Sequence, residues 1–316
     1  MGIHLLNSFL HSLYNNGSKI IHLNELSGKK IVVDTSIYLY RFKSMDALLE
    51  NIYLMCSIVR YHNIHPLFIF DGKAGKNKEI AIQKRRIEKK NARIEYNNIK
   101  KIINTVTDDE RDILEDKMNK LRRRFIKITK EDIHNVKHLL DYNGISYINS
   151  PSEADELCAA MVIKGHAYAC LSEDTDMFAL GCPRILKYIS LKKHTAVLYP
   201  IGNILKKLNI KFDDFQKLCI LSGTDYNFTK KNIFWFYDLY KKYKNSKIDD
   251  EFIGWLQMKN YITLHTYYEL KDVYMIYNKD PSETLRQISY LHIKNKKINK
   301  NGIKSILKKE NFIFAY

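Results

Sequence analysis

The sequence predicts an α/β protein built around a central, mainly parallel twisted sheet flanked by helices. Short apolar runs lie between stretches with helical periodicity, and each run ends in acids: residues 31–33 before Asp34, residues 67–70 before Asp71, and residues 168–171 before Glu173 and Asp174. Continuous apolar runs of this length are typical of strands buried on both faces. Because parallel sheets bind ligands outside the carboxyl ends of their strands, we expect these acids to converge on one edge.

The overall charge favours a polyanionic partner. The chain has 316 residues, 45% of them hydrophobic, which is enough for a sizeable core. Lys and Arg exceed Asp and Glu by 52 to 35, a formal charge of +17 that predicts attraction to nucleic acid or to an anionic membrane surface. A composition rich in Ile, Asn, Lys and Tyr would produce a similar excess, so charge alone leaves both interpretations open.

The cysteines and the hydropathy pattern indicate an intracellular, reducing compartment. The five cysteines form no C-x-x-C pair, so we expect free buried thiols, no disulfides and no zinc site: Cys56, Cys158, Cys170, Cys182 and Cys219. No apolar run approaches the roughly 18 residues of a membrane span, and the N-terminus lacks a signal-peptide pattern. We therefore expect no membrane association.

A long insertion, residues 73–130, interrupts the predicted sheet. It contains no proline and is rich in helix formers, which predicts helices with a basic face and a sparse apolar stripe. Runs of charge usually mark a solvated helix face. Here, however, the basic clusters at 84–86, 89–90 and 122–124 exceed the nearby acids, which favours a role facing a polyanion.

The C-terminal part of the chain reads as helical. Amphipathic helices begin near residue 201, and aromatic, lysine-rich helices follow without a proline- or glycine-rich linker. We expect four parts: a first part of the core, the insertion, a second part of the core, and a basic helical region, at residues 1–72, 73–130, 131–226 and 227–316.

The stretch "SPSEADELCA" predicts the start of a helix. Ser150 suits the N-cap, Pro151 the first helical position, and Glu153 the acid of a capping box. This interpretation accounts for Glu153 but not for Asp155.

Acids at strand ends and helix starts form a larger set. Each has an ordinary structural role when taken singly, but if the sheet gathers them, repulsion will raise several of their pKa values unless cations bind. The set is Asp34, Asp71, Glu153, Asp155, Asp174, Asp176 and Asp225. Because no His or Cys accompanies these acids at ligand spacing, Mg²⁺ or Mn²⁺ suits them best. Two such ions about 4 Å apart are the usual arrangement for phosphodiester displacement. Glu173 is expected to be a loop acid that faces solvent.

Several segments resemble one known family in the same order along the chain. They are "MGI", "VDTSIYLYRF", "FIFDGKAGKNKE", "SPSEADELCA", "LSEDTDMFALG" and "LCILSGTDY", which span residues 1 to 226. The sequence resembles the flap endonucleases, 5′-nucleases of the xeroderma pigmentosum group G class. The resemblance implies a PIN-like 5′-nuclease core, divided by a basic helical arch and followed by a DNA-binding region.

The resemblance also implies roles for individual residues. The seven acids match ligands of two Mg²⁺ ions, with Mn²⁺ as an alternative; Glu153, Asp155 and Asp174 would lie nearest the scissile phosphate, and Asp176 and Asp225 would favour the second ion. Lys78 and Arg85 match arch residues that contact the reacting phosphate. Tyr40 matches an aromatic on which a base stacks, although a core tyrosine is the alternative. Gly2 would lie beside the site, and Lys84, Arg86, Lys230 and Lys231 are expected to contact DNA.

The implied activity is Mg²⁺-dependent hydrolysis of DNA phosphodiesters at single-strand to double-strand junctions, by a metal-activated water that leaves a 5′-phosphate. We expect a monomeric 5′ flap endonuclease with 5′-3′ exonuclease activity in DNA replication and repair, in a nucleus or at a viral replication site. The alternatives are an RNA-directed endonuclease of the same fold and a non-catalytic nucleic-acid-binding protein.

Three departures from the family pattern stand out. Asp155 occupies a position where the family usually has Glu, which predicts an altered metal preference. Residues 227–234 contain no glycine where the family has a glycine-rich loop for duplex phosphates and a potassium ion, so we expect nearby lysines to substitute. The terminal "KKENFIFAY" lacks the Gln of a sliding-clamp peptide, so we expect no such peptide. The composition suggests a large DNA virus or an AT-rich unicellular organism.

Overall fold

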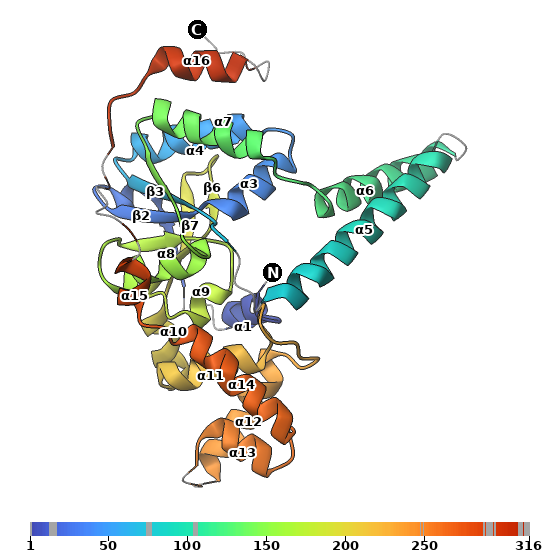
Figure 1. Cartoon of the computed structure of the whole chain (residues 1–316), viewed down its shortest axis with the longest axis vertical. Coiled ribbons are helices and arrows are strands. Elements are labelled where there is room, and N and C mark those ends of the chain that lie inside the picture. The colour runs from blue at the N-terminus through green and yellow to red at the C-terminus, as the bar shows by residue number, and fades with distance from the viewer. Residues whose placement is uncertain are drawn as a thin grey trace.

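The computed structural model consists of a body around one sheet and a helical hairpin that projects from it (Figure 1). It describes residues 2–12, 18–73, 78–103, 107–246, 248, 250–286, 288, 293, 295–308 and 312. The first helix, α1 (Leu6–Ser12), lies near the lower end of the hairpin.

A seven-stranded sheet forms the centre of the described chain, in the order β1-β7-β6-β5-β2-β3-β4. The strands are β1 (Lys19–His22), β2 (Lys30–Asp34), β3 (His65–Phe70), β4 (Ser146–Asn149), β5 (Ala169–Leu171), β6 (Arg184–Ser190) and β7 (Thr195–Pro200). Five adjacent strands run parallel: β6, β5, β2, β3 and β4. Strand β7 pairs antiparallel with β6, and β1 pairs antiparallel with β7. Val33 pairs with both Phe68 and Leu171, so the central strands end together. The predicted mainly parallel sheet is confirmed.

Helices cover both faces of the sheet, which explains the uninterrupted apolar runs. Val32 of β2 packs in one hydrophobic core, and its neighbours Ile31 and Val33 pack in another, because successive side chains of a strand point to opposite faces. The first core includes α8 (Ala154–Ile163), α9 (Asp176–Ala179), α10 (Ile201–Leu208) and α11 (Phe212–Leu221). The second includes η1 (Leu23–Leu26), α3 (Thr35–Lys43), α4 (Leu48–Tyr61) and α7 (Lys130–Tyr142).

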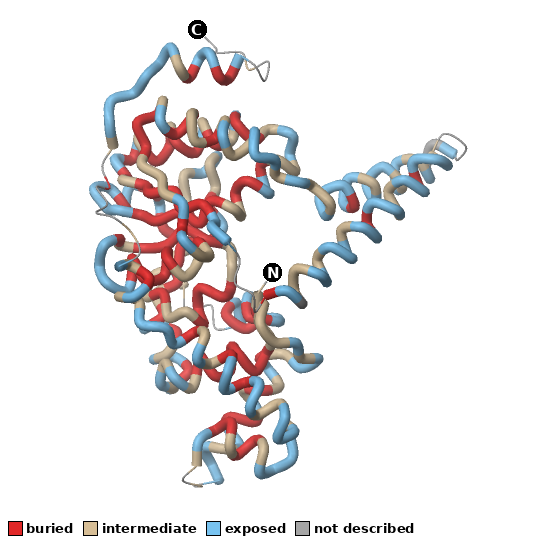
Figure 2. Tube along the Cα trace, in the orientation of Figure 1, coloured by how far each residue is buried: buried red, intermediate tan, exposed pale blue. Residues whose placement is uncertain are grey.

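The insertion forms the projecting hairpin, which we call the arch. Its helices are α5 (Glu79–Ile102) and α6 (Asp108–Arg124), and most of its surface is exposed (Figure 2). Ala92, Ile99 and Leu121 form a small core between the two helices, which is the sparse apolar stripe that the sequence predicts. Thr107 and Glu110 form the capping box that begins α6. The helical prediction is confirmed, and residues 74–77 and 104–106 lie outside the described residues.

An ion pair fastens the returning end of the arch to the body, since Arg122, in the last turn of α6, pairs with Asp46. Just beyond the arch, Nζ of Lys43 in α3 lies 2.8 Å from Oδ1 of Asp132 in the first turn of α7 and so joins these two helices of the body. The arch therefore meets the body at this end as well as at the base of α5.

The C-terminal helices divide between two places. Helices α12 (Ile233–Asn245), α13 (Phe252–Met258) and α14 (Leu264–Tyr277) extend the core around α11 at the bottom of Figure 1. In contrast, α15 (Pro281–Arg286) packs on α8, and α16 (Lys300–Lys308) packs on α7 through Ile303, Ile306 and Leu307. Residues 227–316 are thus largely helical where described, but α15 and α16 lie against helices that flank the sheet.

The cysteines all carry buried, free thiols, as the sequence predicts. Burial raises the pKa of the Cys158 thiol to about 11, so it is unreactive near neutral pH. In the part of the chain that the structure describes, no helix has both the length and the apolar surface needed to cross a lipid bilayer.

Candidate active site

The predicted acids gather where the central strands end. Asp34 is the last residue of β2, Asp71 follows β3, and Asp174 lies just beyond β5. They line a cleft of about 270 Å³ together with Ser36, Ile37, Tyr40, Gly72, Lys78, Ile82, Arg85, Glu153, Asp155 and Asp225. Asp176 adjoins this group, since its backbone N–H donates to Oδ1 of Asp174 at 3.0 Å. The structure therefore brings all seven predicted acids together.

Two loops at this edge are fastened to each other. Ser150 N donates to Phe70 O at 2.8 Å, and Gly72 N donates to Ser152 O at 2.7 Å. A Cβ on Gly72 would lie 2.1 Å from the Ser150 carbonyl oxygen, so only glycine permits this approach. The loop after β3, which carries Asp71, is thus held against the loop that leads into α8.

The predicted N-terminus of α8 is wrong by three residues. The helix begins at Ala154, Glu153 is the N-cap, and the Glu153 side chain makes no capping hydrogen bond. Asp71 accounts for the difference, because its Oδ1 accepts from Ala154 N at 2.9 Å and so satisfies a free donor of the helix. The Ser150 hydroxyl instead donates to the Glu153 carbonyl oxygen at 2.9 Å. The Glu153 carboxylate is consequently free to face the cleft.

Two cations from the base of the arch enter the acid cluster. Lys78 Nζ lies 2.5 Å from Oε2 of Glu153 and 3.3 Å from Oδ2 of Asp225. Arg85 Nη2 lies 2.6 Å from Oδ1 of Asp225. Burial alone would lower the pKa of Lys78, but Asp155 and Glu153 outweigh it and hold that pKa well above its usual range. Both residues therefore remain charged and neutralise part of the cluster.

The remaining acids are not fully neutralised. Burial, followed by the charges of Asp71 and Asp174, raises the pKa of Asp34 to about 7. Burial, with Asp174 and Asp225, raises the pKa of Asp176 to about 8. Burial also raises the pKa of Asp155 despite the opposing charge of Lys78. Asp225 is the exception: although burial raises its pKa, Lys78 and Arg85 prevail and lower it.

The donor set of the cluster fits hard divalent cations. Its carboxylates supply only oxygen ligands, which Mg²⁺ and Mn²⁺ prefer. Asp176 is 2% exposed, and although its Oδ2 accepts from the Tyr277 hydroxyl at 2.7 Å, its Oδ1 is buried without a hydrogen-bond partner. A buried carboxylate oxygen without a donor is unfavourable in the protein alone. The cluster therefore has both spare charge and a spare ligand atom for a cation.

The N-terminus lies directly against this cluster. Ile3 N donates to the Thr175 hydroxyl at 2.7 Å. Gly2 has a φ of 85°, and a Cβ there would lie 2.1 Å from Thr175 Oγ1 and 2.7 Å from Asp174 Oδ1. A side chain at Gly2 would displace the acid, so the structure has Gly2 directly beside Asp174.

The expectation that Glu173 simply faces solvent is wrong. Its Oε1 accepts from Tyr188 N at 2.8 Å, and its carbonyl oxygen accepts from Lys187 Nζ at 2.9 Å. Lys187 has no exposed surface and also donates to Asn7 Oδ1 at 3.0 Å. Its burial lowers the pKa of Lys187 to about 8. Glu173 and Lys187 thus hold the loop that carries Asp174 against α1 and β6.

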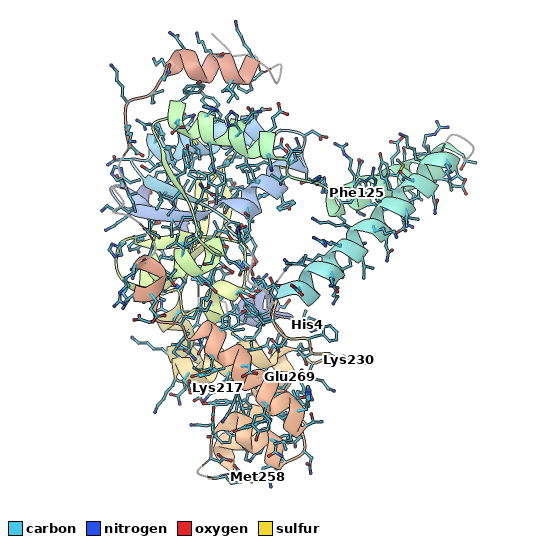
Figure 3. The ribbon with its side chains drawn as sticks, viewed as in Figure 1. His4, Phe125, Lys217, Lys230, Met258 and Glu269 are labelled. Carbon is cyan, nitrogen blue, oxygen red and sulfur yellow. The ribbon has the colours of Figure 1, made fainter. Side chains whose placement is uncertain are left out.

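Of the predicted nucleic-acid contacts other than Gly2, Tyr40 lines the cleft and the others are exposed. Tyr40 lines the cleft, is 43% exposed and has Lys89 Nζ at 5.1 Å from its ring centroid, so it is not a core tyrosine. Lys84 Nζ lies 4.6 Å from the ring centroid of Phe228, which is 76% exposed. The other predicted contacts, Arg86, Lys230 and Lys231, have exposed side chains. In Figure 3, Lys230 lies on the side of the body from which α5 emerges.

Family models and solved structures resemble this chain. The model of the XPG N-terminal domain matches residues 1–92, and that of the XPG I-region matches residues 144–225. The catalytic core of Rad2 in complex with DNA substrate has a TM-score of 0.66 at 21% identity, covering 98% of this chain and 94% of that one. Flap endonuclease-1 from Methanococcus jannaschii has a TM-score of 0.58 at 23% identity, covering 93% and 90%. These structures share the fold.

Curated relatives agree with this likeness. Flap endonuclease 1-A of Oryza sativa subsp. japonica is 29% identical over 245 residues, covering 72% of this chain and 62% of the relative. Flap endonuclease 1 of Mus musculus is 27% identical over 242 residues, covering 72% and 61%. Flap endonuclease 1 of Methanococcus aeolicus is 31% identical over 225 residues, covering 66% of each. The chain spans about three fifths of the length of the first two relatives.

The fold and the acid cluster define a PIN-like α/β core of the kind found in 5′-nucleases. The family models cover more than half of the chain and include each of the seven acids. The chain belongs to the XPG/Rad2 family of flap endonucleases.

Sequence reasoning missed the groups that support the acids. The hydroxyls of Tyr226 and Tyr277 donate to Glu153 and Asp176, and the Ser172 hydroxyl donates to Asp34 Oδ2 at 2.9 Å. Ser172 and Tyr226 each stand within two positions of a predicted acid, so adjacency could have indicated them. Tyr277 is in α14, about a hundred positions along the chain from its partner Asp176. No sequence spacing reveals this pair.

We expect Asp174→Asn to stabilise the metal-free protein. Asp174 is among the charges that raise the pKa values of Asp34, Asp155 and Asp176. Unfolded carboxyls ionise near pH 4, whereas the folded Asp34 and Asp176 keep their protons up to about pH 7 and about pH 8. The free energy of unfolding therefore falls as the pH rises from about 4 to about 8. The substitution should raise the melting temperature in EDTA by roughly 2 °C at pH 8 and by less at pH 5.

Glu173→Gln is the matched control in the same loop. It also removes one negative charge but keeps an amide oxygen that can accept from Tyr188 N. It should give no increase in melting temperature. An increase as large as that of Asp174→Asn, or none from Asp174→Asn at pH 8, would mean that crowding of the cluster does not limit stability.

Proposed function

We propose that this protein is a structure-specific 5′ flap endonuclease with 5′-3′ exonuclease activity, which hydrolyses DNA phosphodiesters in replication and repair. One observation carries the proposal: two arch cations, Lys78 and Arg85, meet the clustered carboxylates at the edge of the sheet. A site with both features can attract a phosphodiester and hold cations against it. The family to which the chain belongs supports the same activity.

We propose two Mg²⁺ ions, or Mn²⁺, as the cofactors. The seven acids would hold them, with Glu153, Asp155 and Asp174 nearest the reacting phosphate and Asp176 and Asp225 toward the second ion. Bound ions of this kind lower the pKa of water and stabilise charge on both oxygens of a phosphodiester displacement. Asp155 is one methylene shorter than the glutamate usual in the family, which favours a tolerance for Mn²⁺.

The chain's own residues would position and neutralise the substrate. Lys78 and Arg85 reach into the cleft from α5 and can donate to phosphate oxygens when these displace the contacts to Glu153 and Asp225. Half-exposed Tyr40 offers a face on which an unpaired base stacks. The single-stranded 5′ end would pass along the arch, and the end base pairs would open to deliver the phosphodiester to the cleft.

Exposed lysines would hold the flanking duplex. Lys84 of the arch lies over Phe228, which brings the base of α5 against the loop after Asp225, and Arg86, Lys230 and Lys231 have exposed side chains. The loop is anchored without glycine: Asn227 Oδ1 accepts from Thr224 N at 3.1 Å, and Asn227 Nδ2 donates to Ile220 O at 2.8 Å. Phosphate contacts from these lysines would replace those of a glycine-rich loop.

Two alternative functions would use the same cleft. An RNA-directed endonuclease would use the same acids and arch, and cleavage of matched DNA and RNA flaps distinguishes the two. A non-catalytic binder is disfavoured, because raised carboxyl pKa values cost stability and a protein that only binds phosphate gains nothing from clustered acids.

We further propose a monomer that works in a reducing intracellular compartment, at a nucleus or viral replication site. The buried free thiols support this location. The segment in which we expect no sliding-clamp peptide, residues 308–316, lies outside the described residues except for Lys308 and Phe312.

Asp174→Asn tests the proposed function most simply. The substitution removes a ligand charge while Asn Oδ1 can still accept from Asp176 N. Cleavage of a labelled DNA 5′ flap in Mg²⁺ should fall by at least about 100-fold, equivalent to roughly 3 kcal/mol. Affinity for the flap should remain within a factor of about three.

The substrates should include a 5′ flap, a double flap, a nicked duplex, a blunt duplex, a single strand and an RNA flap. The control Glu173→Gln should cleave as the wild type does. Persistent cleavage by pure Asp174→Asn protein, or preferential cleavage of the RNA flap by the wild type, would contradict the assignment.

Lys230→Ala combined with Lys231→Ala should weaken duplex binding. Each phosphate contact contributes about 0.9 to the slope of log K against log salt, so the slope should decrease by about 1 to 2. Lys259→Ala is the control, since this exposed lysine adjoins Met258 at the far end of the body in Figure 3. Equal slopes for the double variant and the wild type would show that the loop does not grip DNA.

A further inference from the structure

Three histidines from distant parts of the chain meet outside the acidic cleft. His22 ends β1, His62 follows α4, and His194 lies in the turn between β6 and β7. A ring nitrogen from each lies within 4.8 Å of those of the other two, and Nε2 of His62 is 3.0 Å from Nδ1 of His194. None of the three lines the cleft, so the proposed nuclease chemistry does not explain them.

The backbone fixes this convergence. Leu23 N donates to the His194 carbonyl oxygen at 2.8 Å, which ties the end of β1 to the turn. Gly28 N donates to Asn63 O at 2.9 Å, which ties the segment after η1 to the end of α4. The segments that carry the three rings are thus held together independently of the rings themselves.

The backbone of the turn does not require histidine at position 194. His194 has a φ of 52°, in the left-handed region where glycine or asparagine would serve at least as well. Its ring faces His62 edge to face at 5.0 Å between centroids, and His62 meets His22 in the same way at 5.2 Å. The rings therefore turn nitrogen atoms toward a shared point.

We propose that His22, His62 and His194 form a zinc-binding site that joins the β6–β7 turn to β1 and α4. Three neutral imidazoles without a carboxylate or thiolate suit Zn²⁺, and hard ions such as Mg²⁺ prefer oxygen ligands. The fourth position would be left to water, as in other three-histidine zinc sites. The sequence-based expectation of no zinc site rests on the cysteines, whereas these histidines are too far apart in sequence to form a motif.

The distances require only a small closure. Zn–N bonds of about 2.0–2.1 Å place tetrahedral ligand atoms roughly 3.3 Å apart. The His62–His194 pair, at 3.0 Å, is already near this separation, and the largest separation is below 4.8 Å. His62 is 8% exposed and fixed in place, while His22 is exposed and can turn toward it.

Coordination has a local consequence at the start of η1. Nδ1 of His22 accepts from Asn24 N at 3.3 Å as part of a capping box with Glu25. Binding through Nδ1 uses this lone pair, and binding through Nε2 leaves a proton on Nδ1, so either mode breaks the contact. The amide of Asn24 is therefore a reporter of zinc binding by His22.

A second histidine pair provides a matched comparison. His134 and His138 lie one turn apart on α7, with their Nε2 atoms 3.0 Å apart. The two rings lie on the outer side of the helix, and among the described residues no third histidine joins them. A selective zinc site should depend on the triad and not on this pair.

The test is titration of the full chain with ZnCl₂ in excess Mg²⁺, which occupies the acids. Calorimetry should show one tight site, the melting temperature should rise, and the Asn24 amide resonance should shift. His22→Gln and His194→Asn should each weaken binding by at least tenfold. His138→Gln should bind as the wild type does, and the melting temperature without zinc should be close to that of the wild type in all three variants, which shows that they are folded.

Several outcomes would overturn the proposal. These are the absence of a tight site in the wild type, unchanged affinity in both triad variants, loss of the tight site in His138→Gln, or an unmoved Asn24 amide at saturation. Because the readouts are binding, melting and the amide shift, a failure of the proposed nuclease activity would leave this test intact.

Discussion

Repulsion among the carboxylates at the end of the sheet is the constraint on which the rest of the structure depends. Parallel strands that end together bring Asp34, Asp71 and Asp174 to one edge, and α8 adds Glu153 and Asp155. The surrounding framework offsets the repulsion at each point: Lys78 and Arg85 supply charge, and serine and tyrosine hydroxyls supply hydrogen bonds. The cluster nevertheless retains raised pKa values, and this unfavourable state favours the binding of added cations.

Much of this site could be predicted from the sequence, because its signals are local. An apolar run that ends in an acid predicts that the acid lies at the end of a strand. This pattern alone predicts the positions of Asp34, Asp71 and Asp174. The absence of proline and the abundance of helix-forming residues were sufficient to predict the helices α5 and α6. Family motifs then identified Lys78, Arg85 and Tyr40, which lie in the cleft as expected. Gly2 followed from the same motifs, and its contacts with Asp174 explain why it carries no side chain.

The rest could not be predicted because it depends on contacts between distant segments. The capping rule made Ser150 the N-cap and Pro151 the first residue of α8. Asp71, from the loop after β3, takes the capping role instead, and the helix begins at Ala154. Glu173 reads as a solvated loop acid, yet Tyr188 and buried Lys187 hold it in place. The partner of Asp176, Tyr277, comes from α14, and the triad of His22, His62 and His194 joins three separate elements. Such pairings are set by topology, which local patterns do not contain.

The central claim is that the free cluster holds protons that divalent ions replace. Its most direct test is the number of protons released when Mg²⁺ binds at pH 7, measured by calorimetry in buffers of different ionisation enthalpy. With pKa values of about 7 for Asp34 and about 8 for Asp176, the account predicts the release of roughly one proton or more per chain. Binding of Mg²⁺ at pH 7 without proton release would contradict it.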